Sequence, residues 1–174
     1  MKKLVIQGLG KWGEILVKSL LNSKIAKFTV VVSRNPKSIS SISKKYKLKS
    51  YSTMEEAIKY EKIDGIVLCT PHSVHSKQII NYAKFKKPIF VEKPLALNNE
   101  ELNQIIDASA TSKKTVTVGF NRRFSPFSLR IKKELGNSNS PINVIATMNA
   151  GAIPPDVWVH DLKINLVFSA KKLN

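Results

Sequence analysis

Two charged side chains follow an apolar run at residues 89–91 and stand directly before a proline. The run reads Ile-Phe-Val and predicts a buried strand, after which the chain continues Glu92-Lys93-Pro94. Strands usually end in turn residues, so a carboxylate and an ammonium at this place suggest chemistry. An ammonium beside a reacting alcohol can orient the hydroxyl and stabilise the negative charge that develops on its oxygen. Taken without context, the pair is better explained as a salt bridge at an exposed strand end.

A second chemical pattern is a set of three glycines between the first apolar run and the first helical pattern. Gly8, Gly10 and Gly13 have the G-x-G-x-x-G spacing of a dinucleotide-binding turn. The first permits a tight turn, the second lets a pyrophosphate approach the backbone, and the third lets helix and strand pack closely. The N–H groups around Lys11 and Trp12, at the helix N-terminus, would hold the phosphates. The alternative is a loop of glycines without a ligand.

The end of the second apolar run predicts which dinucleotide is bound. An NAD enzyme normally carries an acid there, about 20 residues past the glycines, for the ribose hydroxyls. This chain has Ser33 and Arg34 at that place, with Lys37 slightly later and no carboxylate. A hydroxyl and a cation suit a 2′-phosphate, so we predict a preference for NADP(H), with NAD(H) also possible. The alternative is a solvated basic loop in a lysine-rich protein.

The elements that must position these residues alternate along the chain. Apolar, strand-like runs cover residues 3–8, 28–33, 65–70, 88–92 and 115–120, and helical patterns lie between them at 11–22, 36–46, 53–60, 73–85 and 98–112. Strands that are apolar throughout and alternate with helices predict an α/β fold with a parallel sheet covered on both faces. We therefore expect a Rossmann-type doubly wound domain over residues 1–120. A helix at 126–135 and a strand at 143–150 predict the incomplete start of a second α/β domain over 121–174.

Composition narrows the classes of function. No apolar run approaches the ~20 residues of a membrane span, and Gln7 and the glycines interrupt the N-terminal run too early for a signal peptide. The single cysteine, Cys69, excludes an internal disulfide framework, and we expect a cytoplasmic protein. The net charge of +17 comes mostly from scattered lysines, because only four of the 29 basic residues are arginine. No nucleic-acid motif accompanies the charge, so we expect anionic small molecules as partners and no nucleic acid.

Four motifs together carry a family resemblance. The glycine turn, "GIVLCTPHSVHS", "IFVEKPLAL" and "VGFNRRFSP" occur in the order and spacing of the Gfo/Idh/MocA oxidoreductases, over residues 1 to about 160. The segment "NAGAIPPDVWVHD" is similar to the branch that contains bacterial cell-surface sugar enzymes. The resemblance implies hydride transfer between a nicotinamide cofactor and a hydroxyl or keto group of a sugar or cyclitol.

The resemblance also implies roles for individual residues. Lys93 matches the lysine that lies beside the nicotinamide and contacts the hydroxyl being oxidised, and its bond to Pro94 is often cis in such enzymes. The other matching positions line the cofactor or enter the substrate domain: Thr70, Pro71, His75, Glu92, Asn121 and Arg122.

Four histidine or tryptophan positions leave alternatives open. His72 and His75 are three residues apart, but no acid or cysteine ligand stands near them, so we expect a cap and a cofactor-side contact and no metal site. Trp158 and His160 could shape a sugar site, since aromatic faces suit carbohydrate rings, or they could pack a short loop.

The resemblance stops after "WVHD". Family members are roughly twice as long, and their second domain supplies an acid, a histidine that accepts the proton, and commonly the oligomer contact. The tail "LKINLVFSAKKLN" matches none of this, which suggests a frameshift or premature stop and leaves the usual oligomer interface largely absent. Two hypotheses follow: an oxidoreductase, completed by another chain, or a catalytically incompetent nucleotide-binding remnant or regulatory module.

Overall fold

The computed structural model describes residues 1–35, 39–136, 143, 145 and 147. Lys37, Trp158 and His160 lie outside these residues, as does most of the strand predicted at 143–150. Their predicted roles stay predictions.

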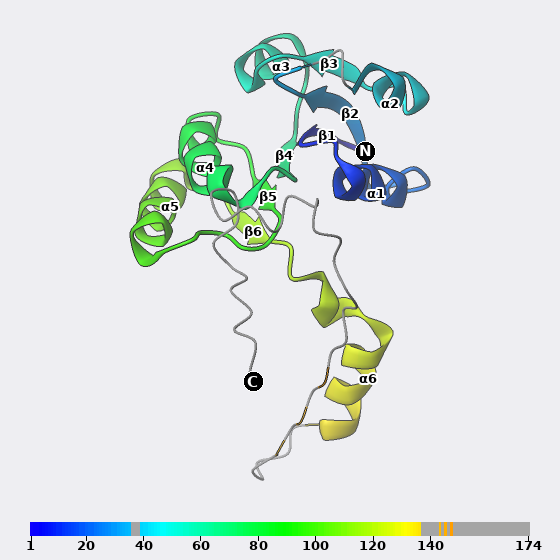
Figure 1. Cartoon of the computed structure of the whole chain (residues 1–174), viewed down its shortest axis with the longest axis vertical. Helices are drawn as coiled ribbons and strands as arrows, with labels where there is room; N and C mark the ends of the chain where they lie inside the picture. Colours follow the sequence, from blue (N-terminus) through cyan, green and yellow to red (C-terminus); the bar gives the residue numbers. More distant parts are fainter. Residues whose placement is uncertain (36–38, 137–142, 144, 146, 148–174) are drawn as a thin grey trace, which may run out of the picture.

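A six-stranded parallel sheet forms the centre of the described part (Figure 1). Its strands are β1 (Lys2–Gln7), β2 (Ala26–Val32), β3 (Lys49–Tyr51), β4 (Gly65–Leu68), β5 (Ile89–Val91) and β6 (Val116–Val118). The order across the sheet is β3-β2-β1-β4-β5-β6, and every neighbouring pair is parallel. This order is that of the Rossmann fold, so the predicted fold class is confirmed.

Helices cover the sheet on both faces, as Figure 1 shows. One apolar cluster includes Met54, Ile79 and Ile105, which come from α3 (Met54–Tyr60), α4 (His75–Ala83) and α5 (Asn99–Ser112) respectively. The other cluster joins the sheet to α1 (Lys11–Ser19) and α2 (Ser40–Lys45). Successive residues of β2 belong to opposite clusters, Val30 to the first and Val31 to the second. The strand is therefore apolar throughout because both of its faces are buried.

Side-chain caps begin three of the helices. At α3, Thr53 accepts a hydrogen bond from the Glu56 N–H while the Glu56 side chain accepts one from the Thr53 N–H, which is the capping box that the spacing predicts. Asn98 caps α5 by accepting from the Glu101 N–H at 2.8 Å. Ser125 caps α6 (Pro126–Leu135), which starts with a proline.

Two details differ from the sequence-based expectations. The sequence does not predict β3, a three-residue edge strand that carries little apolar pattern. The first helix ends at Ser19, and Ile15 and Leu21 are exposed although their spacing suggests an inward face. Val17 and Gly13 are the buried residues of this helix, because the tight turn before it sets which side meets the sheet.

The face of the sheet beside α1 is only partly covered by the described helices. A groove of about 360 Å³ runs there between α1 and strands β4 to β6. Its lining is mostly apolar: Leu4, Leu16, Ser19, Leu20, Phe28, Gly65, Ile66, Val67, Pro88, Ile89, Phe90 and Thr117. Helix α6 also lacks buried residues, with Phe127 79% and Ile131 57% exposed, and Figure 1 shows it projecting away from the sheet.

Among the described residues, no helix is both long enough and apolar enough to cross a membrane.

Candidate nucleotide-binding and catalytic site

The predicted site residues within the described part follow the carboxyl ends of the strands. The glycine turn follows β1, Ser33 and Arg34 follow β2, Thr70 follows β4, Lys93 follows β5, and the segment 119–122 follows β6. These ends share one edge of the sheet because all strands are parallel. The strand order reverses between β1 and β4, and open α/β sheets bind ligands at such a switch point.

The glycine turn has the geometry that its spacing predicts. Gly8 has φ +93°, and a Cβ at this residue would collide with the carbonyl of Cys69. A Cβ at Gly13 would collide with the carbonyl oxygen of Gly8. At Gly10, by contrast, a Cβ would meet nothing within 4 Å, so open space lies in front of the backbone. The first N–H groups of α1 have no carbonyl partner inside the helix and are available to an anion in this space.

A cavity of about 630 Å³ opens beside the ends of β1 and β2. None of its described lining residues is acidic: Gln7, Gly8, Val32, Ser33, Arg34, Asn35, Thr70, Pro71, Ser73, Val74, Lys77, Gln78 and Asn81. The Ser33 hydroxyl exchanges hydrogen bonds with the backbone of Asn35, at 3.2 Å in each direction, which fixes this turn. Two cations, Arg34 and Lys77, therefore face the cavity from different elements.

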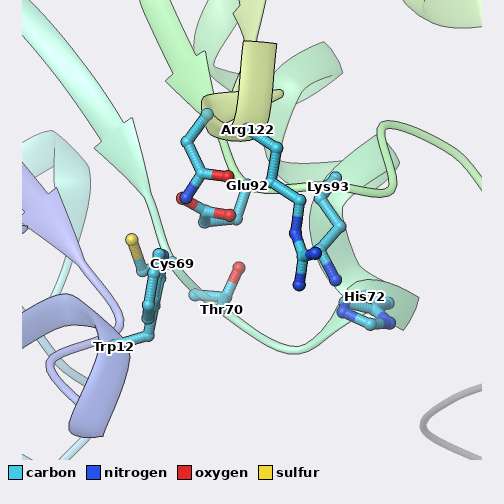
Figure 2. Close-up of a pocket in the computed structure, with 8 residues that line it drawn as sticks. Trp12, Cys69, Thr70, His72, Glu92, Lys93 and Arg122 are labelled. Carbon is cyan, nitrogen blue, oxygen red and sulfur yellow. The ribbon is translucent and has the colours of Figure 1, made fainter. Parts of the chain in front are cut away.

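A second cavity, of about 380 Å³, lies at the ends of β4, β5 and β6 (Figure 2). Eight residues line it: Trp12, Cys69, Thr70, His72, Glu92, Lys93, Asn121 and Arg122. Figure 2 shows the side chains of Lys93 and Arg122 both extending into this cavity toward the side of His72. Thr70 lines both cavities, so the two cavities adjoin at the switch point.

The Glu92-Lys93-Pro94 segment is held by its backbone and by a close neighbour. The Glu92 N–H donates to the Leu68 carbonyl at 3.0 Å, and the Lys93–Pro94 bond is cis. A Cβ at Gly119 would lie 3.0 Å from a Glu92 carboxylate oxygen, so this glycine leaves room for the carboxylate. No ion pair joins Glu92 to Lys93 within the described residues, so the structure gives no support to the salt-bridge explanation.

His75 lies behind the lining of the two cavities. Its side chain is fully buried, with Nδ1 2.7 Å from the Pro94 carbonyl oxygen and Nε2 2.9 Å from the Thr70 carbonyl oxygen. Both ring nitrogens thus contact the backbone, and neither can bind a metal ion while these contacts last. His75 contacts the backbone of Thr70, which lines both cavities, and does not itself line either cavity.

Several lining residues carry no signal in the sequence analysis. Lys77, Gln78 and Asn81 reach the first cavity from α4, and the Thr70 hydroxyl donates to Gln78 Oε1. These three residues lie on α4, the helix that follows β4, and this position is the only feature of the sequence that could have suggested them. The apolar run at 65–70 predicts that Cys69 is a buried strand residue, but it follows β4, is partly exposed and lines the second cavity.

A doubly wound sheet with a glycine turn at its switch point defines a dinucleotide-binding protein of the Rossmann class. Residues 2–120 match the Gfo/Idh/MocA family, described as an oxidoreductase family with an NAD-binding Rossmann fold. The chain belongs to this family, as its four motifs suggest.

The relatives include several inositol dehydrogenases. An inositol 2-dehydrogenase of Rhizobium meliloti (strain 1021) is 27% identical over 172 residues, covering 88% of this chain and 51% of the relative. A myo-inositol 2-dehydrogenase of Thermotoga maritima is 32% identical over 109 residues, covering 62% of this chain and 33% of the relative. The structure of apo scyllo-inositol dehydrogenase from Lactobacillus casei superposes with a TM-score of 0.70 at 25% identity, covering 78% of this chain and 40% of that one. The chain thus spans about half, or less, of the length of these relatives.

Proposed function

We propose that this chain binds a nicotinamide dinucleotide and contributes Lys93 to hydride transfer at a hydroxyl or keto group of a sugar or cyclitol. The single observation that carries the proposal is that the open space at Gly10 and the Lys93 cavity lie at the same edge of the sheet. The relatives named as inositol dehydrogenases support a cyclitol substrate.

The residues fit the cofactor that the family description names. The first turn of α1 offers N–H groups to the pyrophosphate, and the cavity beside β2 has room for the adenosine end. When bound, the nicotinamide ring would supply or accept the hydride. Lys93, in the cavity at the ends of β4 and β5, would hold the substrate oxygen and stabilise the charge that develops on it.

Calorimetric titration of the full chain with NADH and NADPH tests the nucleotide site. The Cβ that Gly10→Ala or Gly10→Val adds meets no atom within 4 Å. We therefore expect the melting temperature of both variants to stay near that of the wild type. Binding should weaken progressively along this pair, by about tenfold or more for valine, because the added atoms occupy the space of the pyrophosphate. Wild-type binding that neither substitution weakens would contradict the placement of the phosphates.

Hydride transfer is tested separately, by oxidation of NADPH and NADH with keto-sugars and keto-cyclitols. We expect Lys93→Ala to lower turnover by about 10²-fold or more while nucleotide affinity is retained. Tight nucleotide binding without any turnover in the wild type would instead support the second candidate, a binding module without catalysis.

We also infer a preference for NADP(H) over NAD(H). The inference is supported by Ser33, Arg34 and Lys77 around a cavity whose described lining has no acid. Arg34→Asp should shift the affinity ratio toward NADH by about tenfold or more, because a carboxylate repels a 2′-phosphate and accepts hydrogen bonds from ribose hydroxyls. The same ratio of NADPH affinity to NADH affinity in wild type and variant would contradict this inference.

We further propose a division of the chain into two domains. We place the nucleotide-binding domain over residues 1–120 and the beginning of a substrate domain over 121–174. Asn121 and Arg122, at the entrance to this second part, line the Lys93 cavity and are candidates for substrate contact. The one cysteine of the chain is compatible with a cytoplasmic setting.

A further inference from the structure

His75 joins the two loops that carry the candidate site. It is the first residue of α4 and has no exposed surface. Its Nδ1 lies 2.7 Å from the carbonyl oxygen of Pro94, and its Nε2 lies 2.9 Å from the carbonyl oxygen of Thr70. Thr70 lines both cavities, and Pro94 directly follows Lys93. One buried ring therefore connects the loop after β4 with the loop that presents the lysine.

The chemistry of the two partners decides the protonation state of this ring. A backbone carbonyl oxygen can only accept a hydrogen bond, whereas a neutral imidazole has one N–H donor and one bare nitrogen. A neutral His75 would direct a lone pair at one of the two oxygens at hydrogen-bonding distance. Turning the ring over would place carbon atoms toward the two oxygens and lose both hydrogen bonds. Only the imidazolium, with an N–H on each nitrogen, satisfies both contacts.

We propose that His75 positions Lys93, and that it does so as an imidazolium whose two N–H groups bind Thr70 and Pro94. The importance of the lysine itself rests on the proposed function. Loss of one proton from the ring breaks one of the two hydrogen bonds and releases the loop of Thr70 or that of Pro94. The geometry of the Lys93 cavity then depends on pH through a residue that does not line it.

The surroundings of His75 act on the imidazolium in both directions. Charge-assisted hydrogen bonds to two carbonyl oxygens favour the imidazolium. Burial and the N-terminus of α4 oppose it, and none of the described carboxylates forms an ion pair with the ring.

The elements packed around the ring carry further titratable groups. His72 lies on the short helix His72–Val74, with its ring centroid 5.8 Å from that of His75. The others are Lys77 on α4, Glu92 and Lys93 after β5, and Glu101 on α5, whose carboxylate accepts from the Leu97 N–H.

The test is nitrogen-15 NMR of the full chain without nucleotide, followed over pH. At pH 6, both ring nitrogens of His75 should show the shifts of protonated nitrogens. As pH rises, one of them should lose its proton, and the amide nitrogen shift of Leu95, next to the Pro94 carbonyl, should change with the same midpoint. His75→Gln should abolish the Leu95 titration, and the matched variant His72→Gln should retain it.

A bare ring nitrogen on His75 at pH 6 would overturn the proposal, as would a Leu95 amide that does not follow the ring. The chain has three histidines, so His72→Gln and His160→Gln assign the His75 signals by elimination if His75→Gln does not fold. Since no nucleotide is present, these outcomes are independent of the calorimetric test of the proposed function.

Discussion

Cys69 lies beside the Lys93 cavity, yet its surroundings make it a poor nucleophile. Burial raises the pKa of the Cys69 thiol to about 12, and the Glu92 carboxylate adds to the rise. The thiolate is the reactive form, and a neighbouring negative charge together with a low-dielectric setting disfavours it. Cys69 therefore lines the cavity in its thiol form, which is a weak nucleophile.

Thiol reagents measure this directly. At pH 8, the native chain should react with a disulfide reagent about 10³-fold more slowly than the urea-unfolded chain, because an ordinary cysteine has a pKa near 8.5. Glu92→Gln should speed the native reaction, since it removes one cause of the raised pKa. A native rate within tenfold of the unfolded rate would contradict this description.

For individual residues, the sequence predicts which residue type a position needs better than it predicts which residues that position contacts. The glycine spacing predicts the turn because backbone sterics alone demand glycine at positions such as Gly8. His75 is different, since its partners Thr70 and Pro94 are brought to it by two separate loops. No local pattern encodes the distances among such loops, so the sequence suggests a cofactor contact and misses the clamp between the loops.

Among the elements, the edge strand β3 depends on polar contacts more than on apolar burial. Two of its three residues are exposed. Glu61, just after α3, accepts hydrogen bonds from Lys49 Nζ and Tyr51 Oη, each at 2.7 Å. The hydrogen bond from Lys49 is the first cause that holds the pKa of Glu61 below its ordinary value of 4.5, with that from Tyr51 second.

A lowered carboxylate pKa means that Glu61 stabilises the fold above its ordinary pKa, and that this contribution is lost as pH falls through the lowered value. Glu61→Gln should therefore reduce the free energy of unfolding by about 1 kcal/mol at pH 7, and wild type and variant should converge at an acid pH below the lowered pKa. Urea unfolding at both pH values measures this. Glu134→Gln is the matched control, because its pair with Arg130 is highly exposed and should contribute nothing measurable.

The elements that the sequence predicts best are those with their own local signals. The α3 capping box and the uniformly buried β4 are recognisable because a few adjacent residues determine them. The strand β3 lacks such a signal, since its place is set by pairing with β2 and by Glu61 from a later element. Ile15 and Leu21 illustrate the same limit for a helix face, because the preceding turn fixes its rotation.

For the molecule as a whole, the partly covered sheet face predicts a measurable apolar surface. The groove beside α1 should bind the dye ANS under native conditions, because its lining is largely apolar and open to solvent. Leu20→Gln places an amide in the groove and should lower ANS fluorescence. Ile25→Gln changes an isoleucine that is 78% exposed outside the groove and should leave the fluorescence unchanged. Equal fluorescence of Leu20→Gln and wild type would show that the groove does not take up the dye.

Most residues that line the two cavities follow a strand end, and this placement has a consequence for how the protein can diverge. The core residues of the strands face helices on both sides, whereas most of the lining residues lie at or beyond the last paired residue of a strand. Mutations at Arg34 or Asn121 therefore change the lining of the two cavities while the buried interior is left intact. One sheet can in this way be retained while the loops that form the candidate site change.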